Sequence, residues 1–192
     1  MSTSRIAHAV AGLTGVTIEA IGFDTGKGMP AAVDYRDHPE QYFEGDFAVP
    51  DLDALARSLP PNTRLMVGDT HQNIARFISG YEGTVGFVSV DVDYYSSTGV
   101  CLELLAAADT RCLPWMPVFF DDVLLSSHNP WCGELLAIRE FNEANSLRKI
   151  SPDTGLRNSR IMKNASWIPQ MYALDHPARA VRADRPPQPR SM

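Results

Sequence analysis

Six aspartates stand at the ends of four apolar, strand-like segments of the chain. They are Asp24, Asp69, Asp91, Asp93, Asp121 and Asp122. In an open α/β sheet, ligands bind outside the carboxyl ends of the strands. Carboxylate oxygens gathered there suit Mg²⁺ or Ca²⁺, whereas the Cys and His residues show no spacing for a zinc site. The pattern therefore predicts a site for a hard divalent cation at one edge of a sheet.

The alternative interpretation is that these aspartates cap the helices that follow the strands. Capping of this kind is common, and it explains any single one of the six about equally well. It does not explain Asp121 and Asp122, because the next helical pattern begins only at Gly133. The cation hypothesis is therefore strongest at this pair.

The elements that must position the carboxylates alternate between strand and helix patterns. Apolar, β-branched runs predict buried strands at 17–23, 64–67, 85–90 and 116–120, with weaker candidates at 147–150 and 170–174. Amphipathic or capped runs predict helices at 5–15, 51–59, 70–79, 97–107 and 133–144. Thr70 caps the third of these, and Ser97 or Thr98 the fourth. The Gly- and Pro-rich residues 25–50 predict a long functional loop. This order predicts an α/β fold with a mostly parallel, Rossmann-like sheet covered by helices on both faces.

Composition limits the class of protein. The chain has 192 residues, of which 44% are hydrophobic and 21% charged, as in ordinary globular proteins. We expect one domain over 1–176 and a disordered Pro/Arg-rich tail over 177–192. The net charge of −6 and scattered basic residues argue against a nucleic-acid partner, and no apolar run is long enough to span a membrane. Without a secretory signal, and with Cys101, Cys112 and Cys132 as reduced thiols, we expect a cytoplasmic protein.

The most specific pattern surrounds Asp91. The segment Asp91-Val92-Asp93 alone also occurs in metal-dependent glycosyltransferases and in phosphatases with an aspartyl nucleophile. Here it continues as Tyr94-Tyr95-Ser96-Ser97-Thr98, followed by a helix, a strand ending at Asp121-Asp122, Gly133 and Ala137-Ile138-Arg139-Glu140-Phe141. This succession, together with residues 22–30, resembles the macrocin O-methyltransferase family. Its members are Mg²⁺-dependent class I methyltransferases that use S-adenosyl-L-methionine on sugar hydroxyls.

The resemblance implies roles for individual residues. Asp91, Asp121 and Asp122 match the metal ligands, and Asp91 also matches the general base. The positions that match the S-adenosyl-L-methionine site are Asp24 at the ribose, Asp69 near the adenine, Thr70 and Asp91. The implied acceptor is a small-molecule hydroxyl, sugar-like or natural-product-like. A homo-oligomer is compatible with the sequence.

One part of the family pattern is missing from these 192 residues. The family has a first strand followed by a glycine-rich loop, and only a short helical segment precedes the strand at 17–23. In the family the first strand lies between the second and the fourth, so without it these neighbours would stand about twice 4.8 Å apart and could not pair. We therefore expect an N-terminally incomplete sheet that binds the cofactor weakly. The alternatives are direct pairing of the two neighbours, another segment in the slot, or the use of 19–28 as the cofactor loop.

Other interpretations stay open. Tyr94, Tyr95, His128 and Trp131 are candidates for the acceptor pocket, but core packing explains the tyrosines equally well and ordinary loop structure explains the other two. A metal-dependent glycosyltransferase would use Asp91 and Asp93 on a nucleotide diphosphate. A non-catalytic methyltransferase-like fragment would keep the fold and bind a partner instead of the cofactor.

Overall fold

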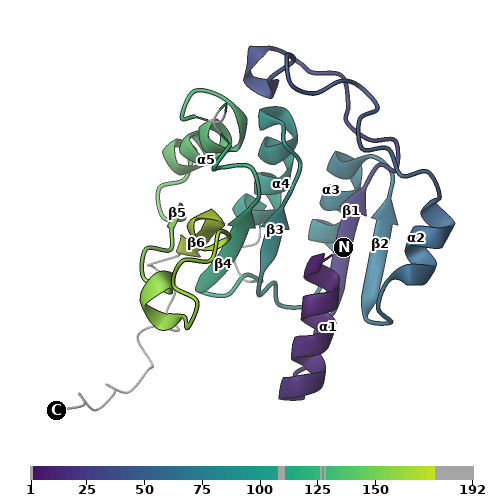
Figure 1. Cartoon of the computed structure of the whole chain (residues 1–192), viewed down its shortest axis with the longest axis vertical. Helices are drawn as coiled ribbons and strands as arrows, with labels where there is room; N and C mark the ends of the chain where they lie inside the picture. Colours follow the sequence, from purple (N-terminus) through teal and green to yellow (C-terminus); the bar gives the residue numbers. More distant parts are fainter. Residues whose placement is uncertain (1, 108–110, 126, 128, 176–192) are drawn as a thin grey trace.

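The computed structural model describes residues 2–107, 111–125, 127 and 129–175 (Figure 1). The helices of this part are α1 (Ser2–Thr14), α2 (Leu52–Ser58), α3 (Thr70–Gly80), α4 (Tyr95–Ala107) and α5 (Gly133–Ala144). The strands are β1 (Ala20–Asp24), β2 (Thr63–Val67), β3 (Val88–Val90), β4 (Trp115–Phe120), β5 (Lys149–Pro152) and β6 (Met171–Asp175). Short 3-10 helices are η1 (Tyr35–Asp37), η2 (Leu156–Ser159) and η3 (Ile168–Gln170). The alternation of strands and helices predicted from the sequence is therefore confirmed.

The strands form two small sheets rather than one. β1 and β2 make a parallel pair, and the second sheet has the order β3-β4-β6-β5. In that second sheet β3 and β4 are parallel, whereas β6 runs antiparallel to both β4 and β5. β5 and β6 are joined by η2, η3 and loops without a crossover α-helix, which suits an antiparallel pair. The expectation of a single, mostly parallel sheet is thus not confirmed for the described residues.

The division between the sheets falls between β1 and β3. Within the described residues β1 has only β2 as a strand partner, and β3 has only β4. The segments that follow β1 and β3 meet, because the Ser96 N–H donates to the Asp37 carboxylate at 2.8 Å. The carboxyl ends of both strands therefore lie on the same side of the molecule, as Figure 1 also shows.

Side-chain packing joins the two sheets across this division. Buried Ile74 and Phe77 of α3 pack against Leu104 of α4, and the Phe77 ring meets Phe23 of β1 edge-on at 5.6 Å. The larger core lies between α4, α5 and the second sheet, around Phe120 and its neighbours on β4. Helix α3 thereby connects β1 with α4 although the strands themselves do not pair.

Local capping residues set two helix starts. The Asp51 carboxylate accepts from the Ala54 N–H at 2.8 Å and caps α2. Asp69 caps α3 in the same way, through the Gln72 N–H at 2.8 Å, and Thr70 is the first residue inside that helix. The prediction that Thr70 is the cap is therefore wrong by one residue.

The start of α4 differs more from the prediction. The helix begins at Tyr95, so Ser97 and Thr98 lie inside its first turn and do not cap it. The Thr98 hydroxyl instead donates to the Tyr94 carbonyl at 2.8 Å. The Ser96 N–H of this end donates to Asp37, which belongs to the loop at 25–50. A cap from so far along the chain leaves no local signal in the sequence.

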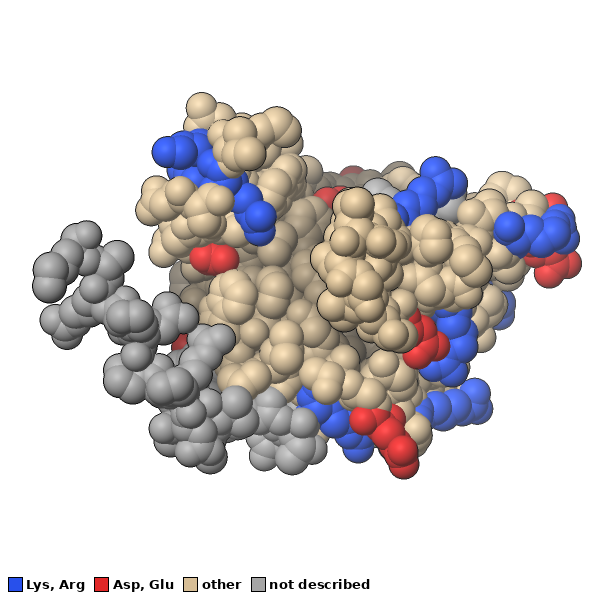
Figure 2. Space-filling model, turned by 90° about the horizontal axis from the view of Figure 1, so that it is seen from below, with Lys and Arg blue, Asp and Glu red and all other residues tan. Residues whose placement is uncertain are grey.

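The surface seen in Figure 2 is mostly uncharged, and Lys and Arg side chains lie beside Asp and Glu side chains on it. In the described stretches no helix is long and apolar enough to cross a membrane. The three cysteines are free thiols. The predicted tail at 177–192 and the candidate residue His128 lie outside the described residues.

Candidate functional site

Two parallel strands bring four of the predicted aspartates to one edge. In the register of β3 and β4, Val90 pairs with Phe120, so Asp91 and Asp121 both follow the last paired residues. The Asp121 N–H donates to the Val90 carbonyl at 3.1 Å, which fixes the two strand ends side by side. Parallel strands lie about 4.8 Å apart. The backbone therefore places Asp91 and Asp121 at the same edge of the sheet.

The turn after β3 folds back toward β4. Asp93 has a left-handed backbone with φ of 56°, a conformation that Asp tolerates better than most residues. Its N–H hydrogen-bonds the Asp122 carboxylate. Asp93 and Asp122 thus come together although they are far apart in the sequence.

Glu134, which the sequence analysis missed, completes the group. The Asp122 N–H donates to Glu134 Oε2 at 3.0 Å. Glu134 is fully buried and Asp122 nearly so, and the other oxygens, Glu134 Oε1 and Asp122 Oδ2, have no hydrogen-bond partner. A signal was present, because Glu134 shares the buried face of α5 with Ala137, Ile138 and Phe141 at helical spacing. An acid on the apolar face of a predicted helix would have identified Glu134 as a buried carboxylate from the sequence.

The carboxylates raise one another's pKa. Burial raises the pKa of Asp122 to about 7, and repulsion from three neighbouring aspartates adds to this. These neighbours are Asp93, Asp121 and Asp91. Burial also raises the pKa of Glu134 to about 9, with repulsion from Asp122 as the next cause. Among the described residues no Lys or Arg lowers the pKa of either group, so neither carboxylate has a side-chain counter-ion there.

The donor set fits a hard cation, but the side chains are not yet arranged around one. In the described part of the chain, no three Asp, Glu, His or Cys side chains lie close enough together to hold an ion as they stand. The buried oxygens without partners, Asp122 Oδ2 and Glu134 Oε1, are the atoms whose hydrogen-bonding capacity is unused. A cation bound here would have to draw the surrounding carboxylates inward.

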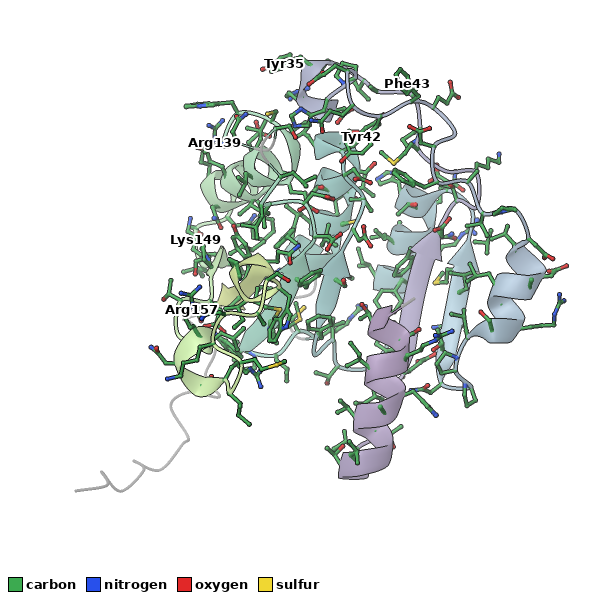
Figure 3. All side chains as sticks on the ribbon, viewed as in Figure 1. Tyr35, Tyr42, Phe43, Arg139, Lys149 and Arg157 are labelled. Carbon is green, nitrogen blue, oxygen red and sulfur yellow. The ribbon has the colours of Figure 1, made fainter. Side chains whose placement is uncertain are left out.

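The loop at 25–50 covers this edge. In Figure 3, Tyr35, Tyr42 and Phe43 lie along the part of the loop that crosses the top of the molecule. The Tyr42 hydroxyl hydrogen-bonds the Asp93 carboxylate, and the Tyr42 ring packs against that of Tyr94 at 5.9 Å. Burial raises the pKa of the Tyr42 hydroxyl, and the nearby carboxylates of Asp93, Asp122 and Glu134 raise it further. Tyr42 is therefore a further residue of the site that the sequence analysis did not identify.

The predicted acceptor residues have different surroundings. Tyr94 is fully buried and its hydroxyl donates to the Tyr42 carbonyl at 3.3 Å, which supports the packing interpretation. The Tyr95 hydroxyl donates to Glu140 at 2.6 Å, and the Arg36 guanidinium lies 4.4 Å from the centre of the Tyr95 ring. Trp131 is 69% exposed. Of these residues only Trp131 presents most of its surface to solvent.

Of the predicted cofactor residues, Asp24, Asp69 and Thr70 lie across the division from Asp91, at the ends of β1 and β2. The Gly68 N–H donates to the Asp24 carbonyl at 2.9 Å, so these two strand ends are adjacent. Asp24 Oδ1 accepts from the Gly26 N–H at 2.6 Å, and Asp69 Oδ1 accepts from the Gln72 N–H at 2.8 Å. One oxygen of each carboxylate is therefore occupied by a local hydrogen bond, in a turn at Asp24 and in a helix cap at Asp69.

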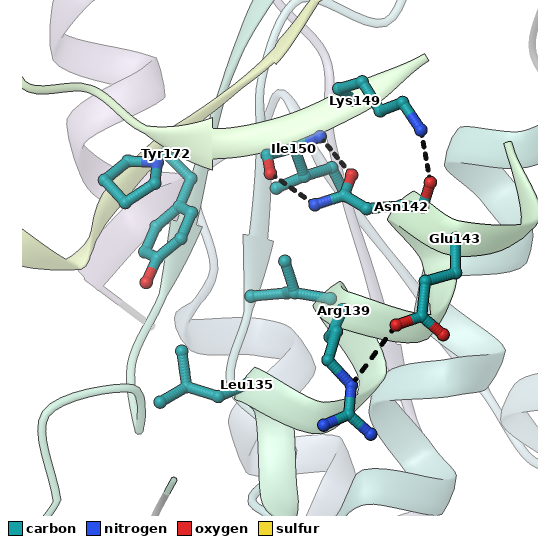
Figure 4. Close-up of a pocket in the computed structure, with 9 residues that line it drawn as sticks. Leu135, Arg139, Asn142, Glu143, Lys149, Ile150 and Tyr172 are labelled. Atoms are coloured by element: carbon teal, nitrogen blue, oxygen red, sulfur yellow. Dashed lines mark hydrogen bonds and ion pairs between the residues drawn. The ribbon is translucent and has the colours of Figure 1, made fainter. Parts of the chain in front are cut away.

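A separate groove of about 570 Å³ lies between α5 and β5 (Figure 4). Its lining includes Leu135, Arg139, Lys149 and Tyr172. None of the aspartates at the ends of β3 and β4 lines it. The groove is therefore separate from the acidic edge formed by Asp91, Asp93, Asp121 and Asp122. Arg139 is ion-paired to Glu143 at 3.6 Å and Lys149 donates to the Asn142 carbonyl, so both cations of the groove have partners.

Comparison with protein-family models, with curated proteins and with solved structures finds no match to this chain.

Proposed function

We propose that this chain is a Mg²⁺-assisted, S-adenosyl-L-methionine-dependent O-methyltransferase of class I type, acting on a small-molecule hydroxyl. The observation that carries the proposal is that Asp91 and Asp121-Asp122 directly follow the carboxyl ends of β3 and β4, which pair in parallel. The sequence pattern around these residues resembles that of the macrocin O-methyltransferase family. The unpartnered oxygen of Asp122 and the lack of a counter-ion among the described residues add support for a cation there.

The fold offers a second line of support. One additional parallel strand between β1 and β3 would join the two sheets into one, in the order β2-β1-new-β3-β4-β6-β5. In the family that the sequence resembles, the first strand lies between the second and the fourth. The division thus falls where the strand missing from the family pattern would lie. The proposed fold is accordingly an incomplete Rossmann-like sheet.

In this proposal the residues at the ends of β3 and β4 serve the metal and the proton transfer, and those at the ends of β1 and β2 bind the cofactor. When bound, S-adenosyl-L-methionine supplies the methyl group, and Mg²⁺ held by Asp91, Asp121 and Asp122 lowers the pKa of the acceptor hydroxyl. Asp24 and Asp69 bind the ribose and the adenine. Asp91 would accept the proton of the acceptor hydroxyl when the methyl group is transferred. Positioning contributes most of the rate enhancement, because the displacement is in line.

Ligand-observed NMR with S-adenosylhomocysteine tests the proposal, because it detects weak binding. Losing two or three hydrogen bonds costs about 1–3 kcal/mol each when partners stay unpaired, so we expect weak binding to this chain. Asp24→Asn should abolish the signal, whereas Asp51→Asn, in which the amide oxygen still caps α2, should leave it unchanged.

The same experiment separates the other candidates. The divided sheet favours a second one, a methyltransferase-like protein that binds a partner without catalysis, and this predicts no signal from S-adenosylhomocysteine at any concentration. A glycosyltransferase would instead show Mn²⁺-dependent binding of uridine diphosphate through Asp91 and Asp93. Either result would count against the methyltransferase proposal.

A further inference from the structure

Glu134 is a fully buried acid whose surroundings do not explain it. It lies in the first turn of α5, where an acid interacts favourably with the helix dipole. That interaction also operates at an exposed position, so it does not account for complete burial. Burying a carboxylate is costly unless it is paired and hydrogen-bonded. Glu134 accepts one hydrogen bond at Oε2, from the Asp122 N–H, and none at Oε1.

The groups that face Glu134 make its burial less favourable still. The carboxylates of Asp122, Asp91 and Asp121 repel it from the strand ends. The charge of Glu134 also raises the pKa of the Cys101 thiol on α4, of the Tyr172 hydroxyl on β6 and of the Tyr42 hydroxyl in the loop, and none of these groups supplies positive charge. Among the described residues no cation compensates it. The missing component of this group of side chains is therefore positive charge.

We propose that Glu134 is a ligand of the divalent cation, so that the ion is held between the strand-end aspartates and the first turn of α5. The inference deepens the proposed function and rests on its cation site. It adds a buried fourth carboxylate to Asp91, Asp121 and Asp122. The unpartnered Glu134 Oε1 and Asp122 Oδ2 become the inner ligands of the ion, which satisfies both atoms at once.

The competing explanation is that Glu134 stays a neutral acid that only fastens α5 to the turn at Asp122. Glu134→Gln separates the two explanations. The glutamine oxygen still accepts the hydrogen bond from the Asp122 N–H, but the amide removes the negative charge. A fastening role survives this substitution, whereas the full ligand role does not.

The experiment is calorimetric titration of the 192-residue chain with MgCl₂ and with MnCl₂ alone, without cofactor or acceptor. The control is Glu143→Gln, because Glu143 is an exposed acid on the same helix whose ion-pair partner is Arg139. Removing an outer-shell partner typically weakens metal binding by about 10–100-fold, and removing a ligand should cost at least as much. We expect Glu134→Gln to weaken binding by at least about tenfold and Glu143→Gln to leave it unchanged.

Three outcomes are decisive. If the wild type and Glu134→Gln bind the ions equally, Glu134 is not a ligand, while the proposed cation site stands. If the wild type binds neither ion, the cation site and this inference both fail. If Glu134→Gln does not fold, Glu134→Asp replaces it, and that shortened acid should bind more weakly than the wild type. Equal affinity of Glu134→Asp and the wild type would overturn the inference.

Discussion

Asp37 of the loop at 25–50 caps α4 through Ser96, far along the chain. One Asp37 oxygen accepts from the Ser96 N–H at 2.8 Å and the other from the Ser96 hydroxyl at 3.0 Å. The Val33 N–H donates to the same carboxylate at 2.8 Å. Asp37 is fully buried, so these three bonds attach the loop to the helix that follows the acidic turn. The loop at 25–50, which covers the site, is thereby hydrogen-bonded to the first turn of α4.

Replacing Asp37 by Ala should therefore destabilise the protein strongly. The change removes a helix cap, worth about 1 kcal/mol, and leaves buried donors without partners at about 1–3 kcal/mol each. We expect a loss of about 2–4 kcal/mol in the free energy of unfolding, measured by urea denaturation. Glu44→Ala is the control, because Glu44 is an exposed acid of the same loop, and it should leave the urea midpoint unchanged. Equal midpoints for Asp37→Ala and the wild type would contradict the capping role.

Stability should fall as the pH rises. Folding raises the pKa of Asp122 to about 7 and that of Glu134 to about 9, so the folded chain binds more protons than the unfolded chain above pH 4. Their contribution is therefore fully present below about pH 4 and is lost between pH 4 and 9, by at most about 1.4 kcal/mol per pH unit for each group. Urea denaturation from pH 5 to 9 checks this. Glu134→Gln should flatten the slope, and an unchanged slope would show that Glu134 is ionised without penalty.

Mg²⁺ should oppose this loss. An ion that binds only the folded state stabilises it by mass action, by about 2.7 kcal/mol at one hundred times its dissociation constant. We expect millimolar Mg²⁺ at pH 8 to raise the melting temperature of the wild type and to have little effect on Asp122→Asn. Thermal melts with matched ionic strength in NaCl exclude a general salt effect. The same rise in both proteins would count against a specific site at Asp122.

Tyr42→Phe should remove the hydrogen bond that joins the loop at 25–50 to Asp93 in the turn after β3. The Tyr42 hydroxyl lowers the pKa of Asp93, although burial raises that pKa overall. Without the hydroxyl, the pKa of Asp93 should rise further, and stability should fall by about 0.5–1.5 kcal/mol. Carbon-13 NMR titration of the aspartate carboxyls measures the pKa, and Tyr35→Phe, an exposed tyrosine of the same loop, is the control. A lower pKa of Asp93 in Tyr42→Phe would contradict the hydrogen bond.

Local patterns predicted most of the helices and strands, and long-range contacts account for what they missed. Helix α5 begins at Gly133 and ends at Ala144 as its amphipathic period indicates, because that period depends only on neighbouring residues. The cap of α4 comes from Asp37, and no local window contains both. The antiparallel direction of β6 likewise depends on how the chain returns after β5. At the site, the spacing located the aspartates, whereas Glu134 became visible only when its burial was known.

The division between the sheets should be measurable in solution. β1 and β3 each have a strand partner on one side within the described residues, whereas β4 lies between β3 and β6. Backbone N–H groups without a ladder partner exchange with solvent more readily, and edge elements open at lower free energy than central ones. We expect the amides of β1 and β3 to exchange with deuterium faster, by at least about tenfold, than those of β4. The amides of β5, the other edge of the same sheet, provide the matched comparison and should behave like those of β3. Protection of β1 and β3 equal to that of β4 would mean that another segment occupies the division in solution, and the sheet would then be complete.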